Sequence, residues 1–111
     1  MAVSEGYQAF VLEQLGRVTR PSAKRMFGGV GIYADGLFIA VIDDDQLYFK
    51  VDETNRPDFE AAGCEPFRPY KDERTMSYYE VPIEVLEDPD RLRDWTNKVI
   101  DVARRARKKK R

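Results

Sequence analysis

Hydrophobic residues in the middle of the chain follow the pattern of β-strands. Apolar residues dominate 26–33 and 37–42, and they alternate with polar ones over 47–51. Asp35-Gly36 separates the first two runs and favours a type I′ hairpin turn, because glycine readily takes a positive φ. Three consecutive aspartates, Asp43 to Asp45, form the second turn. The pattern predicts a three-stranded antiparallel meander from Met26 to Val51, with 37–42 as a central strand covered on both faces.

Segments with a helical period flank this meander. Ser4 is suited to cap a first helix that ends at Gly16, and its apolar stripe is Tyr7, Phe10, Val11 and Leu15. Residues 20–22, which include Pro21, predict an irregular connection. Asp88-Pro89-Asp90 is a favourable helix start. The apolar residues of this last helix recur every three or four positions: Leu92, Trp95, Val99, Val102 and Ala106.

Weaker signals lie between the meander and the last helix. Asn55 can cap a short helix with Pro57 in its first turn, Gly63 at its end, and Phe59 and Ala62 facing inward. Residues 64–74 predict a loop, 75–81 a further strand, and 83–86 one helical turn. We therefore expect an α+β fold. Its antiparallel sheet has the three-stranded meander and one or two later strands, flanked by N-terminal and C-terminal helices.

Length and composition set the class of protein. A chain of 111 residues with 42% hydrophobic residues is sufficient for one domain with a real core. No apolar run reaches the ~18 residues that cross a bilayer, and the N-terminus lacks the features of a secretory signal. The single cysteine, Cys64, cannot form an internal disulfide. We expect a cytoplasmic protein without a membrane association.

Charge divides the chain into an acidic body and a basic tail. Seven of the 19 basic residues lie in the last eight positions, which leaves 12 against 20 acidic residues in 1–103. We expect a domain over 1–103 and a basic tail over 104–111. The tail is either a frayed, solubilising terminus or a set of phosphate contacts for nucleic acid. The residues concerned are Arg104, Arg105, Arg107, Lys108, Lys109, Lys110 and Arg111.

Catalytic and cofactor patterns are weak in this sequence. Histidine is absent, which removes the usual triads and the commonest zinc ligand. Cys64 has no CxxC partner, so we expect a buried or idle thiol. Residues 28–31 lack the ending of a P-loop and predict close backbone packing in a sheet. The three aspartates predict a solvated turn rather than a cation site. We expect no enzyme, cofactor or metal; Glu80 is the best-placed acid for the alternative.

Aromatic residues could form a surface on the predicted sheet. As a stacking surface for bases this set would need interleaved cations, whereas an acidic turn lies beside it. The set is Tyr33, Tyr48, Phe67, Tyr70, Tyr78 and Tyr79. Packing in a core or an interface explains the tyrosines more simply. We expect a homodimer with Tyr33, Tyr48, Tyr78 and Tyr79 at or near its interface, or another protein partner.

Four segments together resemble a known family. They are RMFGGVGIYADGLFIAVIDDDQLYFKVDETNRPDF, GCEPF, MSYYEVP and LEDPDRLRDW. In this order they are similar to the N-terminal domain of TfoX/Sxy proteins, which regulate natural competence in bacteria. The resemblance implies an α+β domain, often dimeric, that has no known catalysis. Competence regulators carry a second, helical domain after this one, whereas this sequence ends in the basic tail. We therefore expect family membership without transferring the regulatory role.

Overall fold

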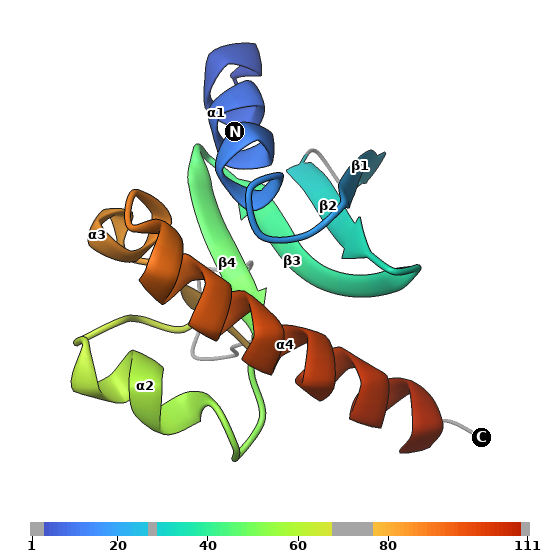
Figure 1. Ribbon diagram of the computed structural model, residues 1–111, viewed down its shortest axis with the longest axis vertical. Helices are drawn as coiled ribbons and strands as arrows, with labels where there is room; N and C mark the ends of the chain where they lie inside the picture. Colours follow the sequence, from blue (N-terminus) through green and yellow to red (C-terminus); the bar gives the residue numbers. More distant parts are fainter. Residues whose placement is uncertain (1–3, 27–28, 68–76, 110–111) are drawn as a thin grey trace.

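Five strands form one antiparallel sheet in the order β1-β2-β3-β4-β5, and helices flank it (Figure 1). The computed structural model describes residues 4–26, 29–67 and 77–109. Its strands are β1 (Pro21–Met26), β2 (Gly29–Ala34), β3 (Leu37–Asp43), β4 (Gln46–Lys50) and β5 (Tyr78–Glu80). Its helices are α1 (Glu5–Leu15), α2 (Arg56–Ala61), α3 (Ile83–Leu86) and α4 (Pro89–Lys109). The predicted α+β class is confirmed.

Both turns of the meander are two-residue hairpins in the left-handed region. Asp35 and Gly36 have φ values of 53° and 74° between the paired Ala34 and Leu37. In the second turn, Asp44 and Asp45 have φ values of 52° and 56°. Positive φ at both central residues is the requirement of a type I′ turn, whose twist matches the flanking strands. The hairpin predicted at Asp35-Gly36 is confirmed, and the second turn has the same form.

The first strand of the meander differs from the prediction. The segment expected to be irregular, 20–22, contributes Pro21 and Ser22 to β1, which pairs with β2 from Pro21↔Ala34 to Met26↔Gly29. Met26 thus ends β1, whereas the sequence pattern placed it in one strand with Ile32; Phe27 and Gly28 lie outside the described residues. Proline is tolerated at the first position of an edge strand. Residues 22–25 are exposed, so β1 lacks the apolar alternation that reveals a strand.

Gly29 marks a close approach of two strands. A Cβ atom at this position would lie 2.6 Å from the backbone oxygen of Ile42 in β3. Only glycine fits such a contact without a shift of the backbone. Backbone packing, which the sequence favoured over a phosphate loop for this glycine-rich run, is therefore confirmed at Gly29.

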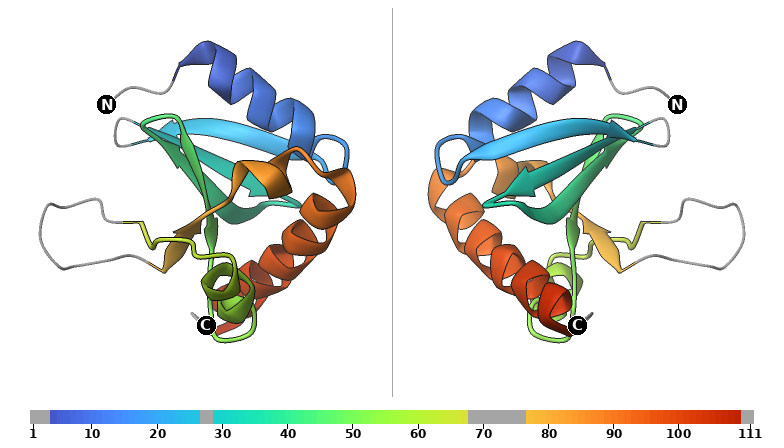
Figure 2. Two further views of the ribbon diagram at one scale, coloured as in Figure 1. Left: turned by 90° about the vertical axis from the view of Figure 1, so that its left-hand side faces the viewer. Right: turned by 90° about the vertical axis from the view of Figure 1, so that its right-hand side faces the viewer.

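Helix α4 crosses the sheet over β3 and β4 and buries the main core (Figures 1 and 2). Its Leu92, Trp95 and Val99 are buried with Phe49 of β4 and Ile42 of β3. The predicted apolar stripe of the last helix is confirmed. Asp88 caps this helix, because its Oδ1 accepts from the backbone N–H groups of residues 90 and 91.

In the part of the chain that the structure describes, helices cover the central strand on one face only. A register shift between Ile32 and Tyr33 leaves Ile39 without a partner in β2, so Ile39 and Ala40 are both buried. Phe38 and Val41 on the opposite face are half-buried. The prediction of coverage on both faces is therefore wrong for these two positions. The run 37–42 is apolar at every position because the bulge turns two consecutive residues toward the core and because the other face of the sheet is aromatic.

Helix α1 is attached to the sheet and to α3 by hydrogen bonds. Ser4 caps the helix as predicted, since its Oγ accepts from the Tyr7 backbone N–H. The Tyr7 hydroxyl in turn accepts from the Leu47 backbone N–H over 3.0 Å. Buried Gln14 donates from Nε2 to the Leu86 carbonyl over 3.0 Å. These contacts explain why α1 shares the core of α4 rather than standing apart.

Helix α2 forms where it was predicted, but the residues at its N-terminal and C-terminal ends have other contacts than predicted. The Asn55 side chain makes no cap bond; it accepts from the Asp52 N–H and donates to the Lys50 carbonyl. Phe59 is buried as expected, whereas Ala62 is exposed and ends the helix instead of facing inward. Gly63 follows with φ 74°. The predicted turn at 83–86 is confirmed as α3.

Strand β5 completes the sheet within the predicted segment 75–81. Tyr78 to Glu80 pair with β4, and Thr75 and Met76 lie outside the described residues. On its other side β5 exchanges hydrogen bonds with Glu65 and Phe67. None of the helices in the described part of the chain combines the length and apolar character needed to cross a bilayer.

Candidate functional site

The outer face of the sheet is the side opposite α4, where strand residues alternate with those of the core. It carries Tyr33 and Phe38, Tyr48 and Lys50, and Tyr78 and Glu80, which the strand pairing places on a common side. The rings of Tyr33 and Phe38 have centroids 5.2 Å apart, and those of Phe38 and Tyr78 6.0 Å apart. Such separations are typical of interacting aromatic pairs. The outer face is thus an aromatic surface built by three hairpin-connected strands and β5.

Tyr78 is the most enclosed ring of the outer face. It is 5% exposed, and the Lys50 ammonium lies 5.3 Å from its ring centroid and 3.5 Å from its hydroxyl oxygen. Burial, together with the nearby Tyr33, raises the pKa of Tyr78 to about 12. The phenol therefore stays neutral at physiological pH and can share a proton with a neighbour but cannot serve as a base.

Tyr48 forms the second aromatic pair of this face. Its ring lies 4.6 Å from that of Phe67, which belongs to the segment beside β5. Burial raises the pKa of Tyr48, and the carboxylates of Glu80, Asp43 and Asp44 raise it further. Tyr48 and Phe67 are only half-buried, so a partner surface would still gain apolar area from them.

Of the four tyrosines predicted for an interface, the structure brings three together on the outer face. Tyr33, Tyr48 and Tyr78 lie there, whereas Tyr79 points to the core face and contacts Phe59 at 5.9 Å. Phe38 was missed, although a two-residue turn at Asp35-Gly36 already implies the pairing Tyr33↔Phe38. Tyr70 lies outside the described residues.

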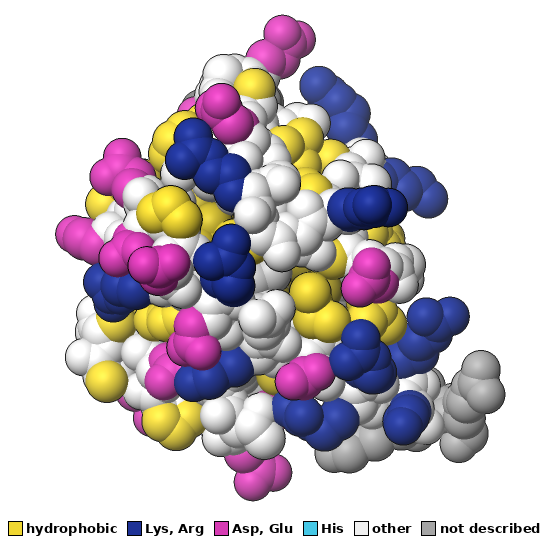
Figure 3. Space-filling view, viewed as in Figure 1, with side chains coloured by type: hydrophobic (Ala, Val, Ile, Leu, Met, Phe, Trp, Pro, Cys, Tyr) yellow, Lys and Arg dark blue, Asp and Glu magenta, His cyan; other side chains and the backbone are white. Residues whose placement is uncertain are grey.

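The basic C-terminal segment is helical through Lys109. Arg104, Arg107 and Lys108 recur at three- and four-residue spacing and therefore share one side of α4. Figure 3 shows Lys and Arg side chains gathered at the lower right, over the end of this helix. The Lys109 side chain and residues Lys110 and Arg111 lie outside the described part.

Arg105 is separated from the other basic residues of this segment. Its guanidinium donates to Asp52 Oδ2 over 3.1 and 3.3 Å and to the Thr54 hydroxyl over 2.6 Å. Burial acts against the charge of Asp52, but the hydrogen bonds from Thr54 and Arg105 hold its pKa below the ordinary value. Arg105 thus fastens α4 to the loop after β4, and its charge is neutralised there.

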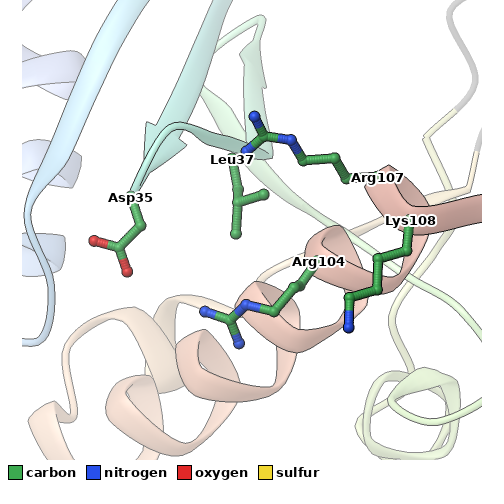
Figure 4. Close-up of a pocket in the computed structure, with 5 residues that line it drawn as sticks. All are labelled: Asp35, Leu37, Arg104, Arg107 and Lys108. Atoms are coloured by element: carbon green, nitrogen blue, oxygen red, sulfur yellow. The ribbon is translucent and has the colours of Figure 1, made fainter. Parts of the chain in front are cut away.

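A pocket of about 350 Å³ lies between the β2–β3 turn and the end of α4 (Figure 4). It is lined by Asp35, Leu37, Arg104, Arg107 and Lys108. Arg104 also donates to Asp101 over 3.0 Å on its own helix. Sequence reasoning found the three cations but not the turn opposite them, because only the tertiary fold brings residues 35–37 to the end of α4.

The remaining groups that the sequence singled out are a thiol and carboxylates. Burial, with Glu80 and Glu84 nearby, raises the pKa of the Cys64 thiol to about 11, which supports the interpretation of an idle thiol. Glu80 Oε1 accepts from the Glu65 N–H at 3.4 Å. Asp45 of the second turn accepts from the Ser4 N–H over 2.8 Å, so it joins the β3–β4 turn to the residue that caps α1. Across the ranges that the structure covers, no three potential metal ligands lie together.

Comparison with known proteins identifies the family. The family model described as the TfoX N-terminal domain matches residues 13–103, which include all five strands and most of α4. A search of the curated proteins finds no match. The matched region covers the outer face and the turn at Asp35, and it ends immediately before Arg104. The chain therefore belongs to the TfoX N-terminal domain family.

Proposed function

We propose that this chain is a non-enzymatic binding domain that associates with a second copy of itself through the outer face of the sheet. The observation that carries the proposal is the half-buried aromatic set on that face: Tyr33, Phe38, Tyr48 and Phe67. Aromatic side chains are enriched in the buried centres of protein interfaces because they supply large apolar area at low entropic cost. The family match supports a binding or regulatory domain that resembles the N-terminal domain of competence regulators.

A second copy suits this face because its charges are mixed. A two-fold interface must be complementary to itself, so each positive group needs a negative one on the same surface. The outer face has Lys50 on β4 and Glu80 on β5, offset by two residues along the paired strands. Two copies in antiparallel contact would place unlike charges around a shared aromatic centre. The absence of histidine and the raised pKa of Cys64 support a role in binding rather than catalysis.

The test is the mass of the protein in solution as a function of concentration, by light scattering or sedimentation. We expect the wild type to form dimers and Phe38→Glu to be monomeric, because a carboxylate would be buried without a partner at the centre of the contact. Ile83→Glu is the matched control, since Ile83 is an exposed apolar residue of α3, 48% exposed, away from this face. It should leave the dimer intact.

Two outcomes would contradict the dimer. One is a wild type that remains monomeric throughout the concentration series. The other is an equal loss of mass in Phe38→Glu and Ile83→Glu, which would indicate general apolar association. Thermal unfolding of both variants shows whether each remains folded, and Tyr33→Glu provides a second position on the outer face if Phe38→Glu does not fold.

The second candidate function is a nucleic-acid accessory role for the end of α4. The specific observation is the side of the helix that carries Arg104, Arg107 and Lys108 together. Phosphate contacts of this kind release counterions, so binding weakens steeply with salt. Fluorescence anisotropy with duplex DNA and single-stranded RNA, at low and physiological salt, should show binding that disappears in a chain ending at Ala103. Absence of binding at low salt would remove this candidate.

A further inference from the structure

Two segments far apart in the sequence form the walls of the pocket at the end of α4. Leu37, which is 6% exposed, and Asp35 come from the β2–β3 hairpin, and three cations come from the last turns of α4. Figure 4 shows the Leu37 side chain pointing into the gap, with Arg104 and Asp35 extending from opposite sides. Because the hairpin turn and the helix are both regular, the walls are positioned by the fold rather than by a loop.

The charge of this pocket is unbalanced. Three cations and Asp35 line the pocket, and Arg104 is also paired with Asp101 on its own helix, which leaves an excess of one positive charge. Within the ranges 4–26, 29–67 and 77–109, the ion pairs of α4 involve Arg104 and Arg105 but neither Arg107 nor Lys108. The helix dipole favours cations near the C-terminal end of α4. It does not explain why two of them, at positions 104 and 108, lie on the same side of the helix, where like charges repel each other. An anion between them would relieve their repulsion.

We propose that this pocket binds the phosphate group of a small phosphate monoester that also carries a hydroxyl group. Arg104 and Arg107 donate to the phosphate oxygens, since guanidinium groups match oxyanions with two parallel donors. Lys108 adds charge. Asp35 accepts a hydrogen bond from the hydroxyl of the ligand, because a carboxylate can only accept. This inference is independent of the dimer, since its cations all come from α4.

The dimensions favour a small ligand over a polymer. A volume of about 350 Å³ is at the lower end of small-molecule sites, which span roughly 300–1,000 Å³. A sugar phosphate fits such a volume, whereas a duplex would present its phosphates along a line and contact only the rim. A polymer would also need a continuous row of cations along the helix. Arg105 does not extend such a row, because its bonds to Asp52 and Thr54 direct it to a different side of the helix.

The experiment is a titration of the ¹⁵N-labelled full chain with inorganic phosphate, ribose 5-phosphate and ribose, followed by NMR. We expect saturable shifts around residues 35–37 and 104–108 with both phosphates and none with ribose. Arg107→Gln should weaken binding of ribose 5-phosphate about tenfold, as the loss of one charged hydrogen bond predicts. Arg105→Gln removes the same group from the same helix end, and it should change the affinity less than twofold.

Asp35→Gly, which removes the acceptor and suits the positive φ of this turn, distinguishes a ligand with a hydroxyl from phosphate alone. The variant should lose the preference for ribose 5-phosphate over inorganic phosphate while still binding both. The proposal is overturned by shifts that do not saturate, or by equal effects of Arg105→Gln and Arg107→Gln, since either indicates diffuse charge attraction. It is also overturned if duplex DNA binds the same residues and ribose 5-phosphate does not compete. A monomeric wild type would contradict the proposed function and leave this result unaffected.

Discussion

The two faces of the sheet are built from adjacent residues of the same strands, yet they differ in chemistry. In β4, Leu47 and Phe49 point to α4 and are fully buried, whereas Tyr48 and Lys50 point outward and are half-buried. The core face is closed by aliphatic side chains and by the Phe59–Trp95 contact at 4.5 Å. Among the described residues, the outer face is covered by its own rings, which pack against one another along the sheet.

The difference shows that aromatic content does not identify which face is the core. Both faces contain rings, and burial raises a pKa beside each, that of the half-buried Cys64 next to the core and that of the buried Tyr78 on the outer face. What separates them is a second layer: helices cover one face, and the other retains polar groups such as Lys50 and Glu80 at its edge. A face of this mixed kind is typical of an interface rather than of a core.

The largest effect should come from exchanging neighbours on the two faces for alanine. Phe49→Ala is expected to lower the free energy of unfolding by about 3–5 kcal/mol, because it opens a cavity among fully buried residues. Tyr48→Ala, one residue away, should cost less than about 1.5 kcal/mol in the monomer, since Tyr48 keeps contact with solvent. Urea unfolding at a concentration below dimer formation measures both. Equal losses would mean that the outer face is a second core.

A smaller effect should follow from removing the polar contact between the helices that cover the core. Gln14 is buried and donates to the carbonyl of Leu86, so it joins α1 to α3. Gln14→Leu keeps the volume but leaves this carbonyl without its donor, which should cost about 1–3 kcal/mol. Gln8→Leu, on the less buried side of α1, is the control and should be nearly neutral. A stabilised Gln14→Leu variant would show that apolar packing alone holds α1 in place.

Much of the fold followed from local patterns. Asp35-Gly36, the Ser4 cap, the Asp88 cap and the apolar stripe of α4 are each decided by neighbours in sequence, and each was predicted. Strand β1 was not, because an edge strand needs no apolar alternation and its exposed residues resemble a loop. The Asn55 side chain was assigned to a cap, whereas it bonds to the Lys50 carbonyl at the end of β4 and to the Asp52 N–H in the loop that follows.

The candidate sites were less predictable than the fold. Tyr79 was grouped with Tyr78, although adjacent strand residues face opposite sides and only one of them can lie on the outer face. Arg105 was grouped with Arg104 because both are basic, and its partner Asp52 is 53 residues away in the sequence. Composition identified the charged segment, whereas the direction of each side chain depends on the tertiary contacts of α4.

The smallest effect should come from the ion pair between Arg105 of α4 and Asp52 in the loop after β4. The pKa of Asp52 is held below its ordinary value of 3.8, so its contribution to stability is present above that pH and is lost as the pH falls further. Asp52→Asn should therefore cost less than about 1 kcal/mol at pH 7, because both side chains are partly exposed. The difference from the wild type should shrink at pH 3 and in high salt, as measured by urea unfolding. Glu53→Gln, at the exposed neighbouring position, is the control for the loss of one negative charge and should leave the free energy of unfolding at pH 7 nearly unchanged. A difference between wild type and Asp52→Asn that stays constant from pH 7 to pH 3 would mean that neither the hydrogen bonds from Thr54 nor the charge of Arg105 stabilises the ionised form of Asp52 in the folded protein.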